Sequence, residues 1–416
     1  IEIMINFESF QLENGLRVVF NQDKNTTLVA VNLLYEIGAK HEDDDATGFA
    51  HLFEHLMFSG SKNYENYDQI VERLGGESNA FTNNDITNYY LSVPNIYLQH
   101  ALDLEADRMQ NLNLNQKSLD VQKSVVIEEF KQRYINQPYG DLWKEIRQLS
   151  FTLHPYQHQT IGKCIEHIEN VSLERAKQFY ENYYTPSNAI LAISGNVELS
   201  ELKTMVENSF GKIPCKKTIK KAYPCEPKQS ENREKTLKAD VPANLICIIF
   251  QMGGRLSEDY YKYDLISDVL SNGKSTRLYN SLVVNQKLFT EINAFITGED
   301  DCGLFVVTGK YRDGVSIEQG EEAIWKELKS MQENMITENE LQKMKNKNDA
   351  NSTFGNIKAL DKAMNLAYFT HLEGKTSLIN QEREQYNKVS LEDLQTLANN
   401  LFNNTNYSTL YYLKNK

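Results

Sequence analysis

Residues 77–82 read Glu-Ser-Asn-Ala-Phe-Thr, and residues 291–296 read Glu-Ile-Asn-Ala-Phe-Ile. The same order of expected elements precedes both stretches: an apolar strand, a glycine and two helices. These elements are a strand at 28–35 and helices at 49–58 and 67–74 in the first half, and a strand at 245–251 with helices at 260–270 and 276–284 in the second. The repeated order predicts an internal duplication.

A stretch of different composition lies near the midpoint. Residues 211–237 contain three prolines and many charges but almost no periodic apolar residues, which is typical of an exposed linker. We therefore predict an α+β fold with two homologous domains, each a β-sheet covered by α-helices. The predicted division is an N-terminal domain at 1–212, a linker at 213–235 and a C-terminal domain at 236–416.

The composition excludes several functional classes. The chain has 416 residues, of which 40 % are hydrophobic, and a formal net charge of −13, as in an ordinary globular protein. Its longest apolar runs, such as 245–250, have the length of one strand, so no segment is expected to span a bilayer. The acidic balance disfavours non-specific binding to nucleic acid.

The five cysteines bear on the compartment. They form no Cys-x-x-Cys pair, which disfavours a zinc ribbon or a thioredoxin-like site. An odd number of scattered cysteines favours a reducing compartment such as the cytoplasm. The periplasm is the alternative if a signal peptide was removed before Ile1.

The segment 48–58, Gly-Phe-Ala-His-Leu-Phe-Glu-His-Leu-Met-Phe, carries the most informative chemistry. In a helix, His51 and His55 lie about 40° apart on one face, and Glu54 lies about 60° to the other side of His51. Two imidazoles can hold zinc, and a nearby carboxylate can accept a proton from water whose pKa the metal lowers. Ordinary polar contacts on a helix are the alternative, but apolar neighbours surround this helix and predict that it is buried.

Zinc requires a third protein ligand. The helix expected at 118–134 offers Glu128 and Glu129. On a helical wheel Glu129 lies within an arc of apolar residues that includes Val121 and Val125, which we expect to be buried, whereas Glu128 lies at its edge. We therefore predict Glu129 as the ligand and Glu128 as a structural acid on the rim.

Two other polar groups are expected to have structural roles. His154 and His158 share the spacing of the helical pair, but Pro155 opposes a helix, so we interpret them as packing residues in a loop. The aspartates at 43–45 form a solvated run whose charge suits the N-terminus of the following helix.

These residues resemble the M16, or pitrilysin-like, metallopeptidases, which include insulin-degrading enzyme and the mitochondrial processing peptidase. The resemblance covers the whole chain and rests on His51-x-x-Glu54-His55 and the distant Glu129. It also rests on Gly-Gly-x-x-Asn-Ala-x-Thr at 75–82 and Pro-Ser-Asn-Ala at 186–189. The length resembles that of a zinc-bearing subunit of the M16B branch.

The resemblance implies a zinc endopeptidase that hydrolyses peptides or unfolded segments in an enclosed chamber, with one Zn²⁺ per chain. His51, His55 and Glu129 would be the ligands and Glu54 the base that activates water. The alternative is a non-catalytic structural or scaffold subunit of an M16-type assembly. Such subunits typically lose the zinc residues, and this chain has all four.

The resemblance also implies a substrate site. Substrate would add as an extra strand beside the strand that contains Asn79, Ala80 and Phe81. Gln122 replaces the glutamate that commonly lies seven residues before the distal ligand, which removes a charge that would tune the site.

The second half departs further from the family pattern. Many members carry an Arg and a Tyr that touch substrate, and the matching positions here are Val283 and Thr290. The helix at 264–270, which corresponds to the zinc helix, contains no histidine. We therefore expect a heterodimer with a homologous subunit that supplies Arg and Tyr, with a homodimer as the alternative.

Overall fold

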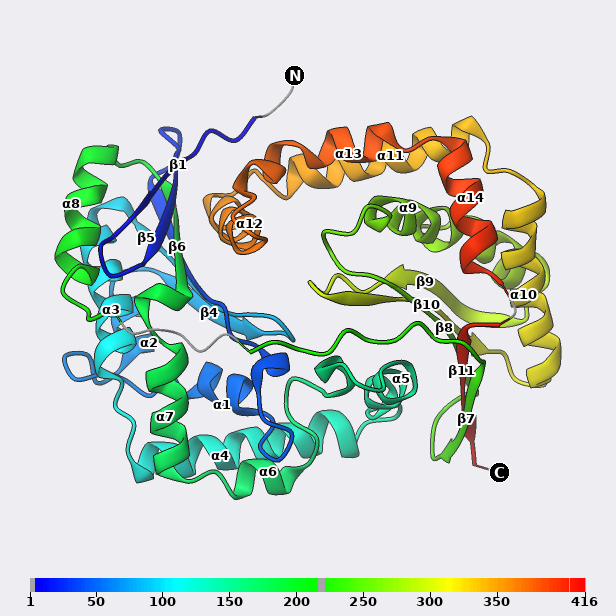
Figure 1. Cartoon of the computed structure of the whole chain (residues 1–416), viewed down its shortest axis with the longest axis horizontal. Coiled ribbons are helices and arrows are strands. Elements are labelled where there is room, and N and C mark those ends of the chain that lie inside the picture. The colour runs from blue at the N-terminus through cyan, green and yellow to red at the C-terminus, as the bar shows by residue number, and fades with distance from the viewer. Residues whose placement is uncertain (1–3, 216–220, 404, 416) are drawn as a thin grey trace. The chain divides into compact units, whose positions relative to one another are not determined.

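The computed structural model describes residues 4–215, 221–403 and 405–415. The described residues form two compact units, each built around one β-sheet (Figure 1). Unit 1 comprises residues up to 131 together with 158–223 and 352–381, and unit 2 comprises 132–157, 224–351 and the residues from 382 onward.

The sheet of unit 1 has the strand order β1-β2-β6-β3-β5-β4. Its strands are β1 (Glu8–Gln11), β2 (Arg17–Gln22), β3 (Leu28–Tyr35), β4 (Glu77–Thr82), β5 (Thr87–Pro94) and β6 (Ala189–Gly195). Strand β2 runs parallel to β6, and the other neighbours are antiparallel. Strand β4 lies at the edge, so one side of its backbone is not paired within the sheet.

The sheet of unit 2 has the order β7-β11-β8-β10-β9. Its strands are β7 (Arg233–Ala239), β8 (Leu245–Gly253), β9 (Phe289–Ile296), β10 (Cys302–Tyr311) and β11 (Tyr407–Lys414). Strand β7 runs parallel to β11, and the remaining pairs are antiparallel, which is the pattern of unit 1 from β2 to β4. The predicted α+β fold with two homologous domains is thereby confirmed.

Helices cover both sheets. Those of unit 1 are α1 (Phe49–Leu56), α2 (Tyr67–Arg73), α3 (Leu98–Asn111), α4 (Gln116–Phe130), α6 (Ile165–Glu169), α7 (Leu173–Tyr183), α8 (Leu199–Phe210) and α12 (Ala359–His371). Those of unit 2 are α5 (Leu142–Ser150), α9 (Tyr260–Ser271), α10 (Ile317–Glu333), most of α11 (Glu338–Phe354), α13 (Glu382–Lys388) and α14 (Leu391–Leu401). Two π-helical turns occur, at Lys131–Ile135 after α4 and at Tyr279–Asn285, where the sequence predicts ordinary helix.

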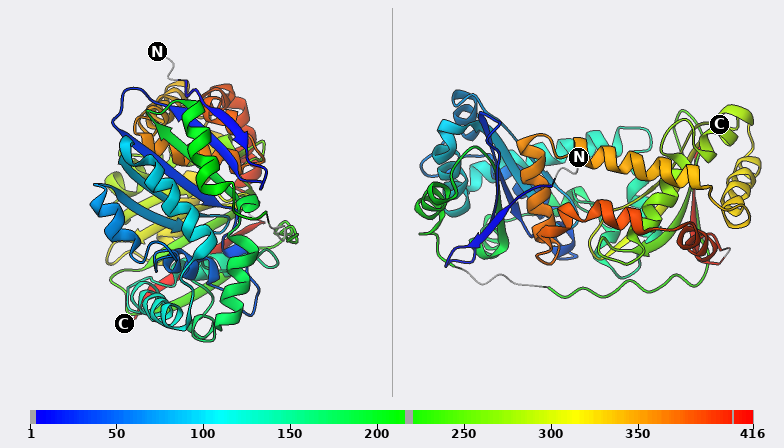
Figure 2. Two further views of the ribbon diagram at one scale, coloured as in Figure 1. Left: turned by 90° about the vertical axis from the view of Figure 1, so that its left-hand side faces the viewer. Right: turned by 90° about the horizontal axis from the view of Figure 1, so that it is seen from above.

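The two units do not follow the predicted division at 1–212, 213–235 and 236–416. Helix α12, from the second half of the chain, packs on β3 and β6 of unit 1, and Figure 2 shows it beside these strands from a second direction. Helix α5, from the first half, packs on β7, β8 and β11 of unit 2. Each sheet thus has one face covered by a helix from the other half of the sequence, because that face is apolar and must be buried.

Part of the predicted linker, residues 216–220, lies outside the described residues. Residues 221–232 contain no helix or strand, and β7 begins at Arg233, inside the predicted linker. Within the described ranges, no helix combines the length and the apolar character that crossing a membrane requires.

Candidate metal centre

Helix α1 places two histidines on one face. The helix begins after Gly48, whose φ of 91° lies in the left-handed region that favours glycine. His51 is 8 % exposed, and the ring centroids of His51 and His55 are 4.9 Å apart. The spacing of four residues therefore presents two imidazoles side by side, as the sequence predicts.

Glu129 of α4 completes a three-residue cluster. Its Oε2 atom lies 3.6 Å from His51 Nε2 and 3.3 Å from His55 Nε2. One ligand atom from each of the three residues lies within 4.8 Å of the others. Ligand atoms held tetrahedrally at about 2.0–2.1 Å from zinc would be roughly 3.3 Å apart, so both the spacing and the two-imidazole, one-carboxylate set fit zinc.

The face of α4 that carries Glu129 is exposed, whereas the sequence predicts that it is buried. Val121 and Val125 are 51 % and 45 % exposed, whereas the sequence predicts that they are buried. They lie on the same face of α4 as Glu129, and this face is open because the helix packs on unit 1 through Leu119, Val126 and Phe130. Glu129 therefore lies beside an exposed apolar strip rather than within a buried one. Glu128 points to solvent and pairs with Lys131, which agrees with its predicted place on the rim.

Glu54 lies on α1 one residue before His55. Its Oε2 atom accepts a hydrogen bond of 2.7 Å from Thr82 Oγ1, at the end of β4. The same strand contains Asn79, Ala80 and Phe81, and the Ala80 N–H donates to Asn79 Oδ1 at 2.8 Å. The edge strand of the sheet and the acid of α1 are thus in direct contact.

Gln122 lies seven residues, or about two turns, before Glu129 on α4. Its Nε2 atom donates to Ser59 Oγ at 3.4 Å, just beyond the end of α1. Among the hydrogen bonds of the described residues, its amide has none to His51, His55 or Glu129. Its role in tuning the ligands stays a prediction.

Glu42 is a residue that the sequence reasoning missed. Its two carboxylate oxygens accept hydrogen bonds from Gly48 N (2.6 Å) and Ala50 N (2.7 Å) at the start of α1. Burial raises the pKa of Glu42 to about 8. The N–H donors favour the charged form and lower the pKa, but burial outweighs them. Glu42, rather than the aspartates at 43–45, therefore provides the acid at the N-terminus of α1. Those aspartates instead pair with surface cations.

A buried charge pair supports α1 from the side of β5. Arg108 and Glu105 of α3 are 1 % and 0 % exposed and form a salt bridge of 2.6 Å. The Arg108 guanidinium lies 4.6 Å from the ring centroid of Tyr89, whose hydroxyl donates to the carbonyl oxygen of Phe53 in α1. The sequence did not predict this support, because α1, β5 and α3 come together only in the folded chain.

The two histidines that we predicted as packing residues in a loop contact acids that are not part of this cluster. His154 Nε2 is 3.2 Å from Asp301 Oδ2 in unit 2, and His158 Nε2 is 3.0 Å from Asp44 Oδ1 in unit 1. Both rings are buried, so the structure supports their interpretation as packing residues.

Unit 2 contains no comparable group among its described residues. Helix α9 carries no histidine, Val283 is buried, and the Thr290 hydroxyl donates to the carbonyl oxygen of Lys310. Neither side chain is a cation or a phenol, and the match of these two positions to the family's Arg and Tyr stays a prediction.

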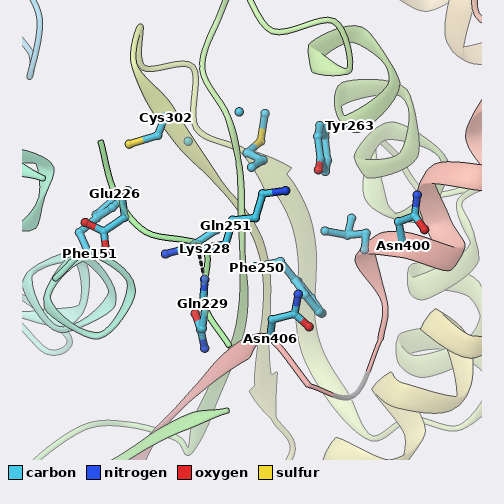
Figure 3. A pocket seen from close by; sticks show the side chains of 14 residues that line it. Phe151, Glu226, Lys228, Gln229, Phe250, Gln251, Tyr263, Cys302, Asn400 and Asn406 are labelled. Carbon is cyan, nitrogen blue, oxygen red and sulfur yellow. Dashed lines mark hydrogen bonds between the residues drawn. The ribbon is translucent and has the colours of Figure 1, made fainter. Parts of the chain in front are cut away.

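A pocket of about 410 Å³ does occur in unit 2, near the end of β8 and α14 (Figure 3). Several of its polar groups serve the fold: Glu226 accepts from the backbone N–H groups of Leu153 and His154, and Gln251 accepts from Gln229 N. The described residues of the pocket contain no histidine and no group of metal-ligating side chains. The cluster on α1 and α4 is therefore the candidate centre for chemistry.

Two family models match the chain. The family model described as "Insulinase (Peptidase family M16)" matches residues 17–148, which contain the His51, His55 and Glu129 cluster. The model described as "Peptidase M16 inactive domain" matches residues 170–348.

Relatives match over nearly the full length. "Zinc protease PqqE" of Helicobacter pylori is 29 % identical over 410 residues, covering 97 % of this chain and 92 % of that protein. "Uncharacterized zinc protease YmxG" of Bacillus subtilis is 25 % identical over 395 residues, covering 94 % of this chain and 95 % of that protein. The crystal structure of a protease from Helicobacter pylori superimposes with a TM-score of 0.91 at 28 % identity, covering 98 % of this chain and 100 % of that one. Because two models of this peptidase family match the chain and relatives named zinc proteases match nearly its whole length, the chain belongs to the M16, or pitrilysin-like, peptidase family.

Proposed function

We propose that the chain is a zinc-dependent endopeptidase that binds one Zn²⁺. The observation that carries the proposal is the meeting of His51, His55 and Glu129, with ligand atoms 3.3–3.6 Å apart at the two His–Glu contacts. Zinc bound there would act as a Lewis acid on a peptide carbonyl and lower the pKa of water.

The residues of the chain supply the rest of the chemistry. Glu54, adjacent to the ligands and held by Thr82, would accept the proton from water and deliver it to the leaving amine. Glu42 would hold the start of α1 so that His51, Glu54 and His55 keep their mutual orientation. Peptides or unfolded segments would add along the open edge of β4, at Asn79, Ala80 and Phe81.

The replacement Glu54→Gln tests the assignment of the base. Gln keeps the size of the side chain but cannot accept the proton, so zinc content should stay near one per chain while turnover of a quenched fluorescent peptide falls about 10²- to 10⁴-fold. Glu128→Gln is the matched control, because Glu128 is an exposed acid of α4 and should leave both unchanged. Normal turnover by Glu54→Gln would exclude Glu54 as the base, and wild-type protein without bound zinc would exclude the metalloenzyme in favour of a scaffold subunit.

We also propose that the active assembly is a heterodimer with a homologous subunit. The proposal is supported by Val283 and Thr290, which provide no charged or phenolic group where many family members carry Arg and Tyr. Activity should rise when the chain is mixed with a homologue that has both residues. Full activity of a monomer, with mass measured by light scattering, would contradict this proposal.

A further inference from the structure

The hydroxyl of Thr82 contacts Glu54, the acid that we propose as the proton acceptor. Thr82 Oγ1 donates to Glu54 Oε2 at 2.7 Å. We propose that Thr82 is a positioning residue that holds the Glu54 carboxylate in one orientation and thereby couples the edge strand β4 to the acid. This inference rests on the proposed function and deepens it.

The donor is held rigidly. Thr82 is the last residue of β4 and pairs with Thr87 of β5, whose own hydroxyl donates to the carbonyl oxygen of Ile37 at 2.8 Å. A β-branched side chain in a strand has few rotamers, so a fixed backbone also fixes the direction of Oγ1.

The acceptor needs such an anchor. Glu54 is half-buried and has three side-chain torsions, so an unrestrained carboxylate would sample several orientations. A hydrogen bond from a neutral hydroxyl to a charged carboxylate is among the stronger side-chain interactions in proteins. With Oε2 engaged by Thr82 Oγ1, the orientation of the whole Glu54 carboxylate is restricted.

The second half of the chain shows that the fold does not require this hydroxyl. The repeated hexapeptide at 291–296 ends in Ile296, which takes the place of Thr82 at the end of the edge strand β9. That half contains no cluster of metal-ligating side chains among its described residues. The hydroxyl is thus present in the unit that has the candidate metal centre and absent from the unit that does not.

The substitutions Thr82→Val and Thr82→Ser separate positioning from packing. Val keeps the shape and loses the donor, so kcat for a fluorescent peptide should fall about 10- to 100-fold, the loss expected for a hydrogen bond to a charged group. KM and zinc content should stay unchanged, and Ser, which restores the donor, should return kcat to within about threefold of wild type. Thr204→Val, in the exposed helix α8, is the control for the Thr-to-Val change itself and should leave kcat unchanged.

Crystal structures of the zinc-loaded wild type and both variants give a readout that does not depend on activity. We expect one Glu54 orientation in the wild type and in Thr82→Ser, and a rotated or multiple orientation in Thr82→Val. An unchanged Glu54 side chain or an unchanged kcat in Thr82→Val would overturn the inference while the proposed function stands. If the wild type proved to have no zinc-dependent activity, the proposed function would fail, and the crystal structures alone would decide whether Thr82 positions Glu54.

Discussion

An ion-pair cluster at Glu36 joins helix α12 to the sheet of unit 1. Glu36 follows β3, and its carboxylate lies 2.6 Å from Arg17 Nη2 and 3.0 Å from His371 Nδ1 at the end of α12. Its side chain is 20 % exposed. Burial opposes ionisation, but His371 and Arg17 outweigh it and lower the pKa of Glu36 from 4.5 to about 2.

The replacement Glu36→Gln should remove a pH-dependent part of the stability. Each pKa unit between the folded and unfolded states is worth about 1.36 kcal/mol, so ionised Glu36 stabilises the fold by up to about 3 kcal/mol at neutral pH. Because the folded pKa is the lower one, this contribution is present above pH ~4.5 and is lost as the pH falls towards ~2. At pH 3 only about 1.4 kcal/mol should remain.

Urea unfolding followed by far-UV circular dichroism, with hydrogen exchange of α12, measures this difference between pH 7 and pH 3. Both tryptophans, Trp143 and Trp325, lie in unit 2, so their fluorescence reports separately on the unit that Glu36 does not touch. Glu198→Gln is the control, because the Glu198 side chain is 68 % exposed and its contacts with Lys24 (3.5 Å) and Gln22 Nε2 (3.0 Å) lie at the surface. Equal stability of Glu36→Gln and wild type at pH 7, or a difference that does not shrink by pH 3, would refute the reasoning.

Three further predictions concern the metal centre and the elements that hold it. Glu129→Gln should weaken zinc binding at least about 100-fold in a chelator competition, because loss of a ligand should cost more than the 10- to 100-fold loss typical of outer-shell partners. Arg108→Met should lower the free energy of unfolding by about 3–5 kcal/mol in urea titrations, because it leaves Glu105 charged and buried. Glu42→Ala should cost about 1–3 kcal/mol in the same measurement and weaken zinc binding, because two N–H groups at the start of α1 lose their acceptor.

Each of these variants has a control substitution at an exposed side chain. Glu128→Gln should keep full zinc affinity, and a loss equal to that of Glu129→Gln would reverse the choice between the two acids. Lys131→Met, from a surface pair, should cost less than about 1 kcal/mol. Asp45→Ala, at a side chain that is 79 % exposed, should leave α1 intact, and a cost like that of Glu42→Ala would contradict the capping role.

Features that depend on neighbours in the chain were predictable. Strand β3 has the predicted bounds at Leu28–Tyr35, and α9 begins at the predicted Tyr260. The meeting of His51 and His55 follows from the helical repeat alone. The duplication was also predictable, because repeated residues impose the same order of elements on both halves and hence the same strand order.

Features that depend on long-range packing could not be predicted from the sequence. The exchange of α5 and α12 between the two units depends on which apolar face meets which sheet, and neither helix pattern specifies its partner. Glu129 lies beside the two histidines, as its angle on the helix predicts, but the neighbouring Val121 and Val125 are exposed, because periodicity identifies a face without saying what covers it. The sequence by itself thus determined the family, the duplicated architecture and the histidine pair, since local periodicity and spacing encode them. Only the tertiary structure decided that Glu42 caps α1, that Arg108 supports it and that Thr82 contacts Glu54, because each is a contact between segments that the chain brings together only on folding.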